Sequence, residues 1–442
     1  MAEETKQIKE PKEIFLNEKQ RDILEKVKLG NNAFITGFAG SGKSYLIDSI
    51  TSALKQQGKT VALTAMTGCA ALLINGKTLH SELGIGLAKG EPKDLYKRIC
   101  RMEGMLGHLL SLDVLIIDEV SMLSDILFDK ISDLFKLVKS SCNKVKCNVD
   151  KPFGGKLQVI LVGDMSQLKP IEGDYCFYSK DWDSACMNVC VLTQNMRVDN
   201  DTRFDTLLQK LRFGVISDLE LIEKMKSNNF ETNPDLVSVK PTKLFSKNKD
   251  VDSINQYELG QLLKNGRESI SYKVHYTENP MKLKCSTKYA QDAKIPEFLT
   301  LCIGAQVMVT RNLSFDEGIV NGTRGVIVAL SKTSVIIQLV NGSCFTVSYF
   351  HVKPERADDE ATKYLDFKYL PLQLSWAMSI HKSQGATIDC LEIDLGESIF
   401  TTGQAYVAIS RARNSDSVKI TQFDTRSIKV SKAVVEFYKK YR

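Results

Sequence analysis

The chain has 442 residues, of which 43% are hydrophobic and 25% are charged, the proportions of an ordinary globular protein with a large core. Lys and Arg outnumber Asp and Glu by 59 to 53, and this net charge of +6 permits a polyanionic partner without requiring one. No apolar run reaches the ~20 residues of a membrane-spanning helix, and the charged amino terminus lacks the apolar core of a signal peptide. We therefore expect a soluble intracellular protein of several domains, with no membrane association.

The cysteines and histidines give no sign of a metal site. The eleven cysteines include no C-x-x-C pair, and the five histidines do not cluster with them. Because zinc ligands usually occur as close pairs, reduced and mostly buried thiols are the better interpretation. Such thiols are typical of a reducing compartment.

Residues 17–198 alternate helical and strand-like segments. Asn17 and Gln20 form the sequence pattern of a capping box and open a helix that ends near Leu29. The other expected helices are 43–57 and 125–139, and the expected strands are 33–37, 60–65 and the runs LDVLIID, KLQVILVGD and VCVLT. Continuous apolar strands separated by helices predict a parallel sheet covered on both faces, and hence a doubly wound α/β fold.

The pattern changes after two helical stretches at residues 201–213 and 217–228. From about residue 270 to residue 370, Gly-containing turns separate short strand-like runs, which predicts a small antiparallel β domain. An α/β pattern returns at LPLQLSWAMSIHKSQGAT and continues to GQAYVAISRAR. The expected organisation is a first α/β domain at 1–195 and a second at 196–269 and 371–442, interrupted by a β-rich insertion at 270–370.

The strongest motif is a glycine-rich loop between an expected strand and an expected helix. It matches G-x-x-x-x-G-K-[ST], the phosphate-binding loop of nucleoside triphosphatases. Its glycines let backbone N–H groups surround phosphates, Lys43 neutralises the β- and γ-phosphates, and Ser44 offers its hydroxyl to Mg²⁺. The nucleotide-binding residues predicted from this loop are Gly37, Ala39, Gly40, Ser41, Gly42, Lys43 and Ser44.

Two acidic residues follow the run LDVLII. Asp118 ends this strand, where its carboxylate can hold Mg²⁺ beside the phosphate loop, and Glu119 can accept a proton from the attacking water. A third strand ends at VGDMSQL, which places Gln167 to reach a γ-phosphate or to orient water. The alternatives are a helix cap for the acidic pair and a solvated loop side chain for Gln167. The residues alone thus predict a Mg²⁺-dependent nucleoside triphosphatase.

Longer segments occur in one order along the chain: ALTAMTGCAALL, GKTLHSELGIG, LIIDEVSML, PFGGKLQVILVGDMSQL, LTQNMR, IGAQVMVTRN, VNGTRGVI, SWAMSIHKSQGAT and GQAYVAISRAR. With the phosphate loop, they resemble the petite-integration-frequency (PIF) family of superfamily-1B DNA helicases, which are related to RecD. The resemblance covers residues 17–413. It implies two RecA-like P-loop NTPase domains with ATP between them, a small inserted β-barrel domain, and a small wedge insertion near residues 76–95.

The resemblance also assigns roles to residues whose local sequence is uninformative. Gln20 resembles the family's adenine-reading glutamine, Gln167 its γ-phosphate sensor, and Gly385 the position that approaches the nucleotide. Arg197 and Arg411 resemble two arginine fingers that reach the γ-phosphate across the cleft. The implied catalytic set is Lys43, Asp118, Glu119, Gln167, Arg197 and Arg411, with ATP and Mg²⁺ as cofactors.

The predicted DNA contacts rest on the same resemblance, since alone these residues indicate helix caps, turns or packed side chains. They are Thr67, Gly68, His80, Asn321, Arg324, His381, Lys382 and Ser383. Two aromatic residues, Phe153 and Trp376, are expected to be buried rather than to stack on bases. One departure is Lys169, which stands where the family usually has proline and adds a charge near the path between the domains.

We therefore expect an ATP-dependent DNA helicase that moves 5′→3′ on single-stranded DNA, binds junctions between single and double strands, and works as a monomer. Such motors serve DNA replication, recombination and repair, in the nucleus of a eukaryote or for a nuclear virus, and otherwise in the cytoplasm. One alternative is a nucleic-acid translocase, or an ATPase that remodels RNA or protein–DNA complexes without strand separation. Another is a nucleotide-gated binding module.

Overall fold

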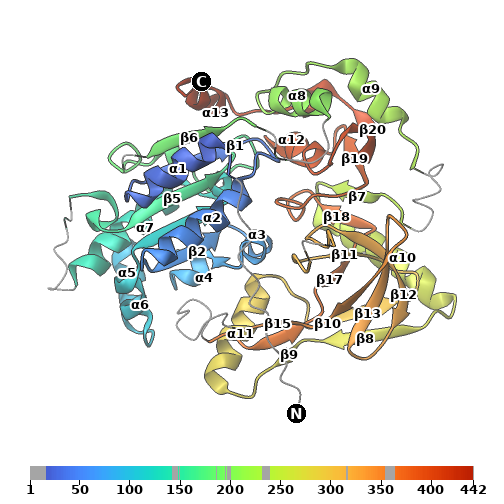
Figure 1. Ribbon diagram of the computed structural model, residues 1–442, viewed down its shortest axis with the longest axis horizontal. Helices are drawn as coiled ribbons and strands as arrows, with labels where there is room; N and C mark the ends of the chain where they lie inside the picture. Colours follow the sequence, from blue (N-terminus) through green and yellow to red (C-terminus); the bar gives the residue numbers. More distant parts are fainter. Residues whose placement is uncertain are drawn as a thin grey trace, which may run out of the picture.

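The computed structural model describes residues 16–141, 148, 150–185, 187–194, 196, 201–230, 239–314, 317–353 and 364–441. Figure 1 shows three parts: an α/β part coloured blue to green, a second α/β part in green and red, and a β-rich part in yellow and orange. Within the described ranges, no helix combines the length and the apolar character needed to cross a membrane.

The first α/β part is built on a six-stranded parallel sheet in the order β3-β2-β4-β5-β1-β6. Its strands are β1 (Ala33–Gly37), β2 (Val61–Ala65), β3 (Lys77–Thr78), β4 (Val114–Asp118), β5 (Gln158–Gly163) and β6 (Asn188–Leu192). Every residue of β1, β4 and β5 is buried, because helices cover both faces of the sheet. The doubly wound α/β prediction is confirmed for this part.

Two core clusters lie on the two faces of this sheet, because successive strand residues point to opposite sides. Ile35 belongs to the cluster with the apolar residues of α1 and α2, whereas Phe34 belongs to the cluster with those of α7. The helices are α1 (Glu18–Lys28), α2 (Lys43–Gln56), α3 (Gly68–Leu73), α4 (Leu79–Glu82), α5 (Pro92–Cys100), α6 (Met105–Ser111) and α7 (Asp125–Ser140). The predicted capping box is present, since Asn17 Oδ1 accepts from the Gln20 N–H at 2.8 Å and Gln20 Oε1 from the Asn17 N–H at 3.1 Å.

The second α/β part has a four-stranded parallel sheet in the order β18-β7-β19-β20. Its strands are β7 (Thr242–Phe245), β18 (Ala377–Ser379), β19 (Leu391–Leu395) and β20 (Val418–Phe423), and its helices are α8 (Thr202–Leu211), α9 (Leu219–Ser227), α10 (Asn248–Lys264) and α12 (Gln404–Ile409). All residues of α12 are buried. This helix therefore lies inside the protein, with neighbours on every side.

Between β7 and β18 the chain forms the β-rich part, whose strands pair antiparallel. They are β8 (Ser269–Lys273), β9 (His275–Tyr276), β10 (Phe298–Cys302), β11 (Gln306–Val309), β12 (Arg324–Leu330), β13 (Ser334–Leu339), β14 (Cys344–Ser348), β15 (Phe350–Val352), β16 (Phe367–Tyr369) and β17 (Leu372–Leu374), with one helix, α11 (Pro280–Asp292). The strands divide into the sheets β14-β13-β12-β11-β17, β10-β8 and β15-β16-β9. Closure into a barrel, which the resemblance implies, stays a prediction.

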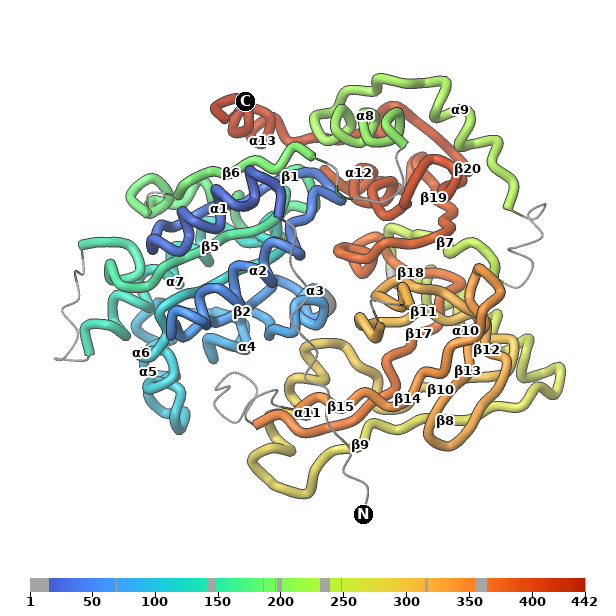
Figure 2. Tube along the Cα trace, viewed as in Figure 1, coloured from blue at the N-terminus to red at the C-terminus, as the bar shows by residue number. Residues whose placement is uncertain are grey.

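Two features of the structure differ from the expected domain organisation, whose bounds stay a prediction. β17 pairs with β11 of the inserted sheet, so the β-rich part continues beyond residue 370. The last helix, α13 (Lys432–Lys439), leaves the second α/β part and packs on the first, where Val434, Phe437 and Tyr438 join the core cluster of Phe34. The spacing of these three residues forms one apolar helix face, and the first part supplies the aromatic side chains that bury it. Figure 2 shows the red carboxyl-terminal end on the side of the first part, beyond β6.

Candidate nucleotide site and nucleic-acid interface

The predicted phosphate loop joins the end of β1 to the start of α2, and its glycines are required by the backbone. Gly42, the residue before α2, has φ +79°, and a Cβ there would lie 2.9 Å from both Gln20 Nε2 and Met196 Cγ. A Cβ on Gly37 would lie 2.5 Å from Ser41 Oγ. Larger residues at these positions would distort the loop.

The ammonium group of Lys43 curls back over this loop. Its Nζ donates to the carbonyl oxygens of Gly37 at 2.9 Å and Phe38 at 3.0 Å. Burial lowers the pKa of Lys43, although the carboxylates of Asp164 and Glu119 act in the opposite direction. No acidic side chain of the described residues comes within ion-pair distance of this ammonium, so a bound phosphate would supply its missing counter-charge.

The acidic pair lies at the end of β4, as predicted. Asp118 and Glu119 are each 8% exposed, and Asp118 Oδ1 accepts a hydrogen bond from the Glu119 N–H at 2.8 Å. Burial and the neighbouring Glu119 raise the pKa of Asp118. Glu119 has φ +54°, a left-handed conformation that residues other than glycine rarely adopt. Two buried carboxylates held this closely favour a cation between them and the phosphates.

A cavity of about 510 Å³ connects these elements with the second α/β part. Its lining residues are Ala39, Gly40, Gly42, Lys43, Ser44, Tyr45, Asp118, Glu119, Gln167, Met196, Gly385, Ala386, Thr387 and Arg411. Most of the predicted nucleotide residues are therefore brought together around one cavity. Arg197 lies outside the described residues, although Met196 before it lines the cavity.

Gln20 lies behind the phosphate loop and is fully buried. Its Oε1 is used in the capping box, but its Nε2 has no hydrogen-bond partner among the described residues. The Ser41 hydroxyl is also buried without a partner there. Buried polar groups are almost always hydrogen-bonded, so both atoms fit a site that a nucleotide completes.

Arg411 reaches the cavity from the second position after the end of α12. Its guanidinium is 4% exposed and donates to carbonyl oxygens of its own domain: Nε to Val407 at 3.0 Å, and Nη1 to Ser383 at 3.3 Å and Ala386 at 3.2 Å. These bonds fix the positive charge at the edge of the cavity. The position is the one expected for a cation that acts across the interface between the domains.

Sequence reasoning missed Gln384, which bridges the two domains at this cavity. Its Nε2 donates to Glu119 Oε2 at 2.8 Å and to Gln167 Oε1 at 3.0 Å. The available signal was its place in HKSQG, directly before Gly385. The contact itself depends on how the two sheets sit together, which local sequence does not encode.

Several predicted DNA-binding residues converge on the end of α11. The Thr67 side chain caps α3 by accepting from the Ala70 N–H at 3.2 Å, and a Cβ on Gly68 would lie 2.3 Å from the Asp292 carbonyl oxygen. Burial lowers the pKa of His80 while Asp292 opposes the shift. Desolvation and the nearby Lys294 lower the pKa of His381. The next residue in the chain is Lys382, another of the predicted DNA contacts. Residues from both α/β parts thus lie near one segment of the insertion.

Two other predicted DNA-binding residues, Arg324 and Ser383, have side chains that bond to carbonyl oxygens of this chain, and their contact with DNA stays a prediction. Arg324 is fully buried, and its Nη1 donates to the Lys240 carbonyl oxygen at 2.7 Å. The Ser383 hydroxyl is buried and donates to the Ile380 carbonyl oxygen at 2.8 Å. The Arg324 bond joins the insertion to the chain just before β7, and the Ser383 bond stays within its own turn.

Asn321, another predicted DNA contact, lies in a turn of the insertion. The Asn321 N–H donates to Asn312 Oδ1 at 3.0 Å, and a Cβ on the following Gly322 would lie 2.0 Å from the Thr387 carbonyl oxygen. This turn therefore packs directly against a residue that lines the nucleotide cavity.

Phe153 and Trp376 are 1% and 7% exposed and belong to core clusters, so the prediction that they are buried is confirmed.

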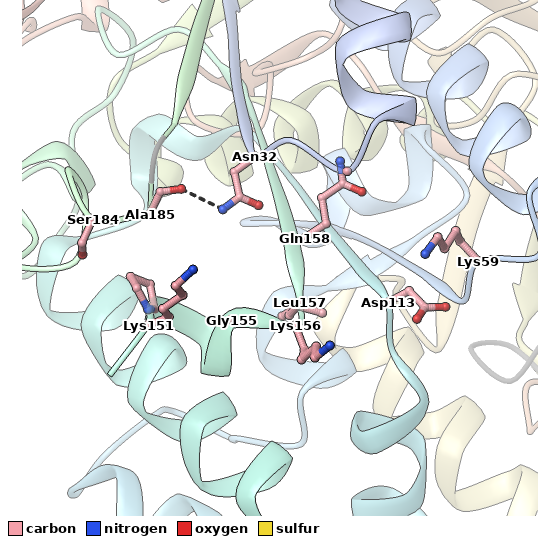
Figure 3. Close-up of a pocket in the computed structure, with 12 residues that line it drawn as sticks. Asn32, Lys59, Asp113, Lys151, Gly155, Lys156, Leu157, Gln158, Ser184 and Ala185 are labelled. Carbon is pink, nitrogen blue, oxygen red and sulfur yellow. Dashed lines mark hydrogen bonds between the residues drawn. The ribbon is translucent and has the colours of Figure 1, made fainter. Parts of the chain in front are cut away.

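A second cavity, of about 310 Å³, lies at the opposite edge of the first sheet, where its strands begin (Figure 3). Its amide side chains already have partners. Asn32 Nδ2 donates to the Ala185 carbonyl oxygen at 2.8 Å, and Gln158 Nε2 donates to that of Val27 at 2.8 Å. These groups join the loops of this edge, so the cavity is a structural feature.

Comparison with known proteins follows the same division of the chain. Residues 15–220 match the model of the PIF1-like helicase family, and residues 293–330 match that of the DNA helicase Pif1 2B domain. The structure is similar to the crystal structure of Pif1 helicase from Candida albicans, with 30% identity, a TM-score of 0.75, and coverage of 97% of this chain and 100% of that one. The chain belongs to the Pif1 helicase family.

Two further Pif1 relatives define how far the similarity extends. The ATP-dependent DNA helicase PIF1 of Xenopus laevis is 36% identical over 435 residues, which are 97% of this chain and 65% of the frog protein. This chain thus spans less than two thirds of that relative. A Bacteroides Pif1 helicase in complex with ADP-AlF3 and single-stranded DNA is 27% identical, with a TM-score of 0.64 and coverage of 97% of both chains.

Proposed function

We propose that this Pif1-family chain is an ATP-dependent DNA helicase that translocates 5′→3′ on single-stranded DNA and separates duplex or otherwise structured DNA. The observation that carries the proposal is the cavity that the phosphate loop, the acidic pair and Arg411 share between two α/β parts. A site completed by both parts couples nucleotide binding to their relative position, which is what a motor requires.

Within this site we assign each group a task. Lys43 neutralises the β- and γ-phosphates once it turns from the carbonyl oxygens of the loop toward the nucleotide. Glu119 accepts a proton from the attacking water, and Gln167 orients that water or senses the γ-phosphate. Arg411, together with Arg197, stabilises the charge that develops on the transferred phosphoryl group. Gln20 reads the base with its unpaired amide.

We further propose that Ser44 and Asp118 hold Mg²⁺ with the nucleotide. Both residues line the cavity, and the raised pKa of Asp118 is the signature of a buried carboxylate that a cation would neutralise. The ion would offset the negative charge of the phosphates, with Ser44 and Asp118 as its protein ligands. The residues of this chain would then supply the remaining positive charge and the base.

The proposed partner is single-stranded DNA and its junctions with duplex, bound by a monomeric motor. The support is the cluster around the end of α11, where Gly68, His80 and His381 of the two α/β parts meet the insertion. The segment at 76–95 is proposed to act as the wedge. The proposed location follows the DNA: the nucleus in a eukaryotic host, and otherwise the cytoplasm.

A duplex carrying either a 5′ or a 3′ single-stranded tail tests this function. We expect ATP-driven opening of only the 5′-tailed duplex, with Lys43→Ala inactive and Lys55→Ala, on the exposed side of α2, unchanged. Opening of only the 3′-tailed duplex would overturn the polarity. ATP hydrolysis that single-stranded DNA stimulates, without opening of either duplex, would favour the translocase. ATP hydrolysis at the same rate with and without DNA would favour the nucleotide-gated module.

A further inference from the structure

A buried polar cluster joins the two α/β parts behind the phosphate loop, and the mechanism above does not use it. Its centre is Asp164, the fully buried residue that follows β5. The Asp164 carboxylate accepts from Arg212 Nε at 2.9 Å, from the Tyr406 hydroxyl at 3.0 Å and from the Tyr438 hydroxyl at 3.3 Å. Arg212 lies at the end of α8, Tyr406 in α12 and Tyr438 in α13, so one carboxylate gathers three distant segments.

Tyr406 occupies a special place in this cluster, because its hydroxyl both donates and accepts. It donates to Asp164 Oδ2 and accepts from the N–H of Ala39, a residue of the phosphate loop, at 3.2 Å. The residue is 3% exposed, and its ring belongs to the core cluster of the second domain. A phenolic hydroxyl can donate and accept at once, so this one group satisfies both partners.

Arg411 lies two residues beyond the end of the helix that carries Tyr406. α12 spans only Gln404–Ile409, so the hydroxyl contact and the guanidinium lie within a few residues of each other on one short buried segment. The start of the helix is close to the first domain as well, since a Cβ on Gly403 would lie 2.2 Å from the Gln167 carbonyl oxygen. The contacts of Tyr406 and Gly403 thus set how near Arg411 can come to the phosphate loop.

We infer that Tyr406 is a positioning residue for ATP hydrolysis: it fixes α12 on Ala39 and Asp164, and thereby places Arg411 at the nucleotide. This inference rests on the proposed ATPase function. The neighbouring groups support such a role, because Arg212 also donates to Thr36 Oγ1 at 3.3 Å in the strand before the loop, and Tyr438 shares a 2.6 Å hydrogen bond with the same hydroxyl. A buried network satisfied in this way is rigid, and rigidity is what positions a catalytic group.

The test removes only the hydroxyl. We expect Tyr406→Phe to lower the kcat of single-strand-stimulated ATP hydrolysis between ~10-fold and ~100-fold, since misplacing a catalytic group by about 1 Å has effects up to this size. The KM for ATP should change less than about threefold, because Arg411 acts mainly on the transition state. Tyr272→Phe is the matched control: this tyrosine is also 3% exposed and donates to the Ser331 carbonyl oxygen at 2.7 Å, but it lies in the insertion.

A double-mutant cycle with Arg411→Ala separates positioning from a general structural effect. If Tyr406 acts through Arg411, the variant that carries both Tyr406→Phe and Arg411→Ala should be no slower than Arg411→Ala alone. Multiplied losses, or a kcat for Tyr406→Phe equal to that of the unmodified protein, overturn the inference. Absence of any ATP hydrolysis by the unmodified protein would instead overturn the proposed function.

A second variant covers the case in which Tyr406→Phe does not fold. Gly403→Ala leaves every hydroxyl in place but pushes α12 away from Gln167, so it should give the same selective loss of kcat. Hydrolysis at the rate of the unmodified protein in Gly403→Ala would show that the placement of α12 does not limit the reaction.

Discussion

The side-chain nitrogen of Gln384 lies 2.8 Å from Oε2 of Glu119, so the second α/β part holds the proposed general base of the first. The same amide donates to Gln167 at 3.0 Å. One side chain therefore links the groups proposed to activate and to orient the attacking water. Its Oε1 has no partner among the described residues, which leaves an acceptor free for that water.

Replacing this amide should slow hydrolysis without weakening nucleotide binding. We expect Gln384→Ala to reduce kcat for ATP by ~10-fold or more while KM changes little, because Glu119 loses the donor that orients it. Steady-state ATPase assays with saturating single-stranded DNA measure both constants. Gln338→Ala, in β13 of the insertion, is the control. An equal rise in KM and fall in kcat/KM, with kcat intact, would contradict an orienting role.

Gly385 should tolerate no side chain. A Cβ at this position would lie 2.9 Å from Leu73 Cδ1 and 3.7 Å from Glu119 Oε1, on a backbone with φ +81°. We expect Gly385→Ala to abolish most ATP hydrolysis and to lower the free energy of unfolding by about 1–2 kcal/mol, the cost of a left-handed alanine. ATPase assays and urea unfolding measure the two effects.

Gly58→Ala provides the matched control for this backbone strain. Gly58 has φ +74°, but a Cβ there meets nothing within 4 Å. The stability loss should be similar, and the ATPase activity should equal that of the unmodified protein. If both variants keep full activity, the approach of Gly385 to Glu119 has no functional meaning.

The local sequence was sufficient to predict those parts of the fold and of the site that one segment forms by itself. The buried strands, the phosphate loop and the acidic pair follow from short apolar runs and a fixed spacing, and the structure places Lys43 and Asp118 on one cavity. The local sequence was insufficient to predict contacts between segments that are distant in the chain. Gln384 and Tyr406 act through contacts between domains, and the Arg324 guanidinium is buried because it reaches a carbonyl oxygen 84 residues earlier in the chain.

The stability of the first domain should depend on acidic pH through Glu82. Its carboxylate is 1% exposed and accepts from His108 Nε2 at 2.8 Å, with Lys77 Nζ at 3.4 Å. Burial alone would raise the pKa of Glu82, but Lys77 and His108 outweigh this effect and lower it to about 2, from an ordinary value of 4.5. The ionised form is thus favoured by folding.

A lowered pKa in the folded state gives stability that is present above the unfolded value and disappears as the pH falls. We expect a loss of about 3 kcal/mol of unfolding free energy as the pH falls from above 4.5 toward 2. Urea unfolding across this range, compared with Glu82→Gln, isolates the contribution of this carboxylate. Identical pH slopes for both proteins would show that its interactions do not favour the ionised form.

The carboxyl-terminal helix should stabilise the domain that it does not follow in sequence. Phe437 is 6% exposed, with ring centroids 4.4 Å from Phe177, 5.9 Å from Trp182 and 6.0 Å from Phe34 of β1. We expect Phe437→Ala to cost about 3–5 kcal/mol, the usual effect of removing a buried aromatic ring. Amide hydrogen exchange shows which domain loses stability, and we expect faster exchange of the β1 amides. Phe400→Ala, at a side chain that is 57% exposed, should leave the exchange of the β1 amides unchanged. Faster exchange confined to β19 and β20 would place α13 with the second domain instead.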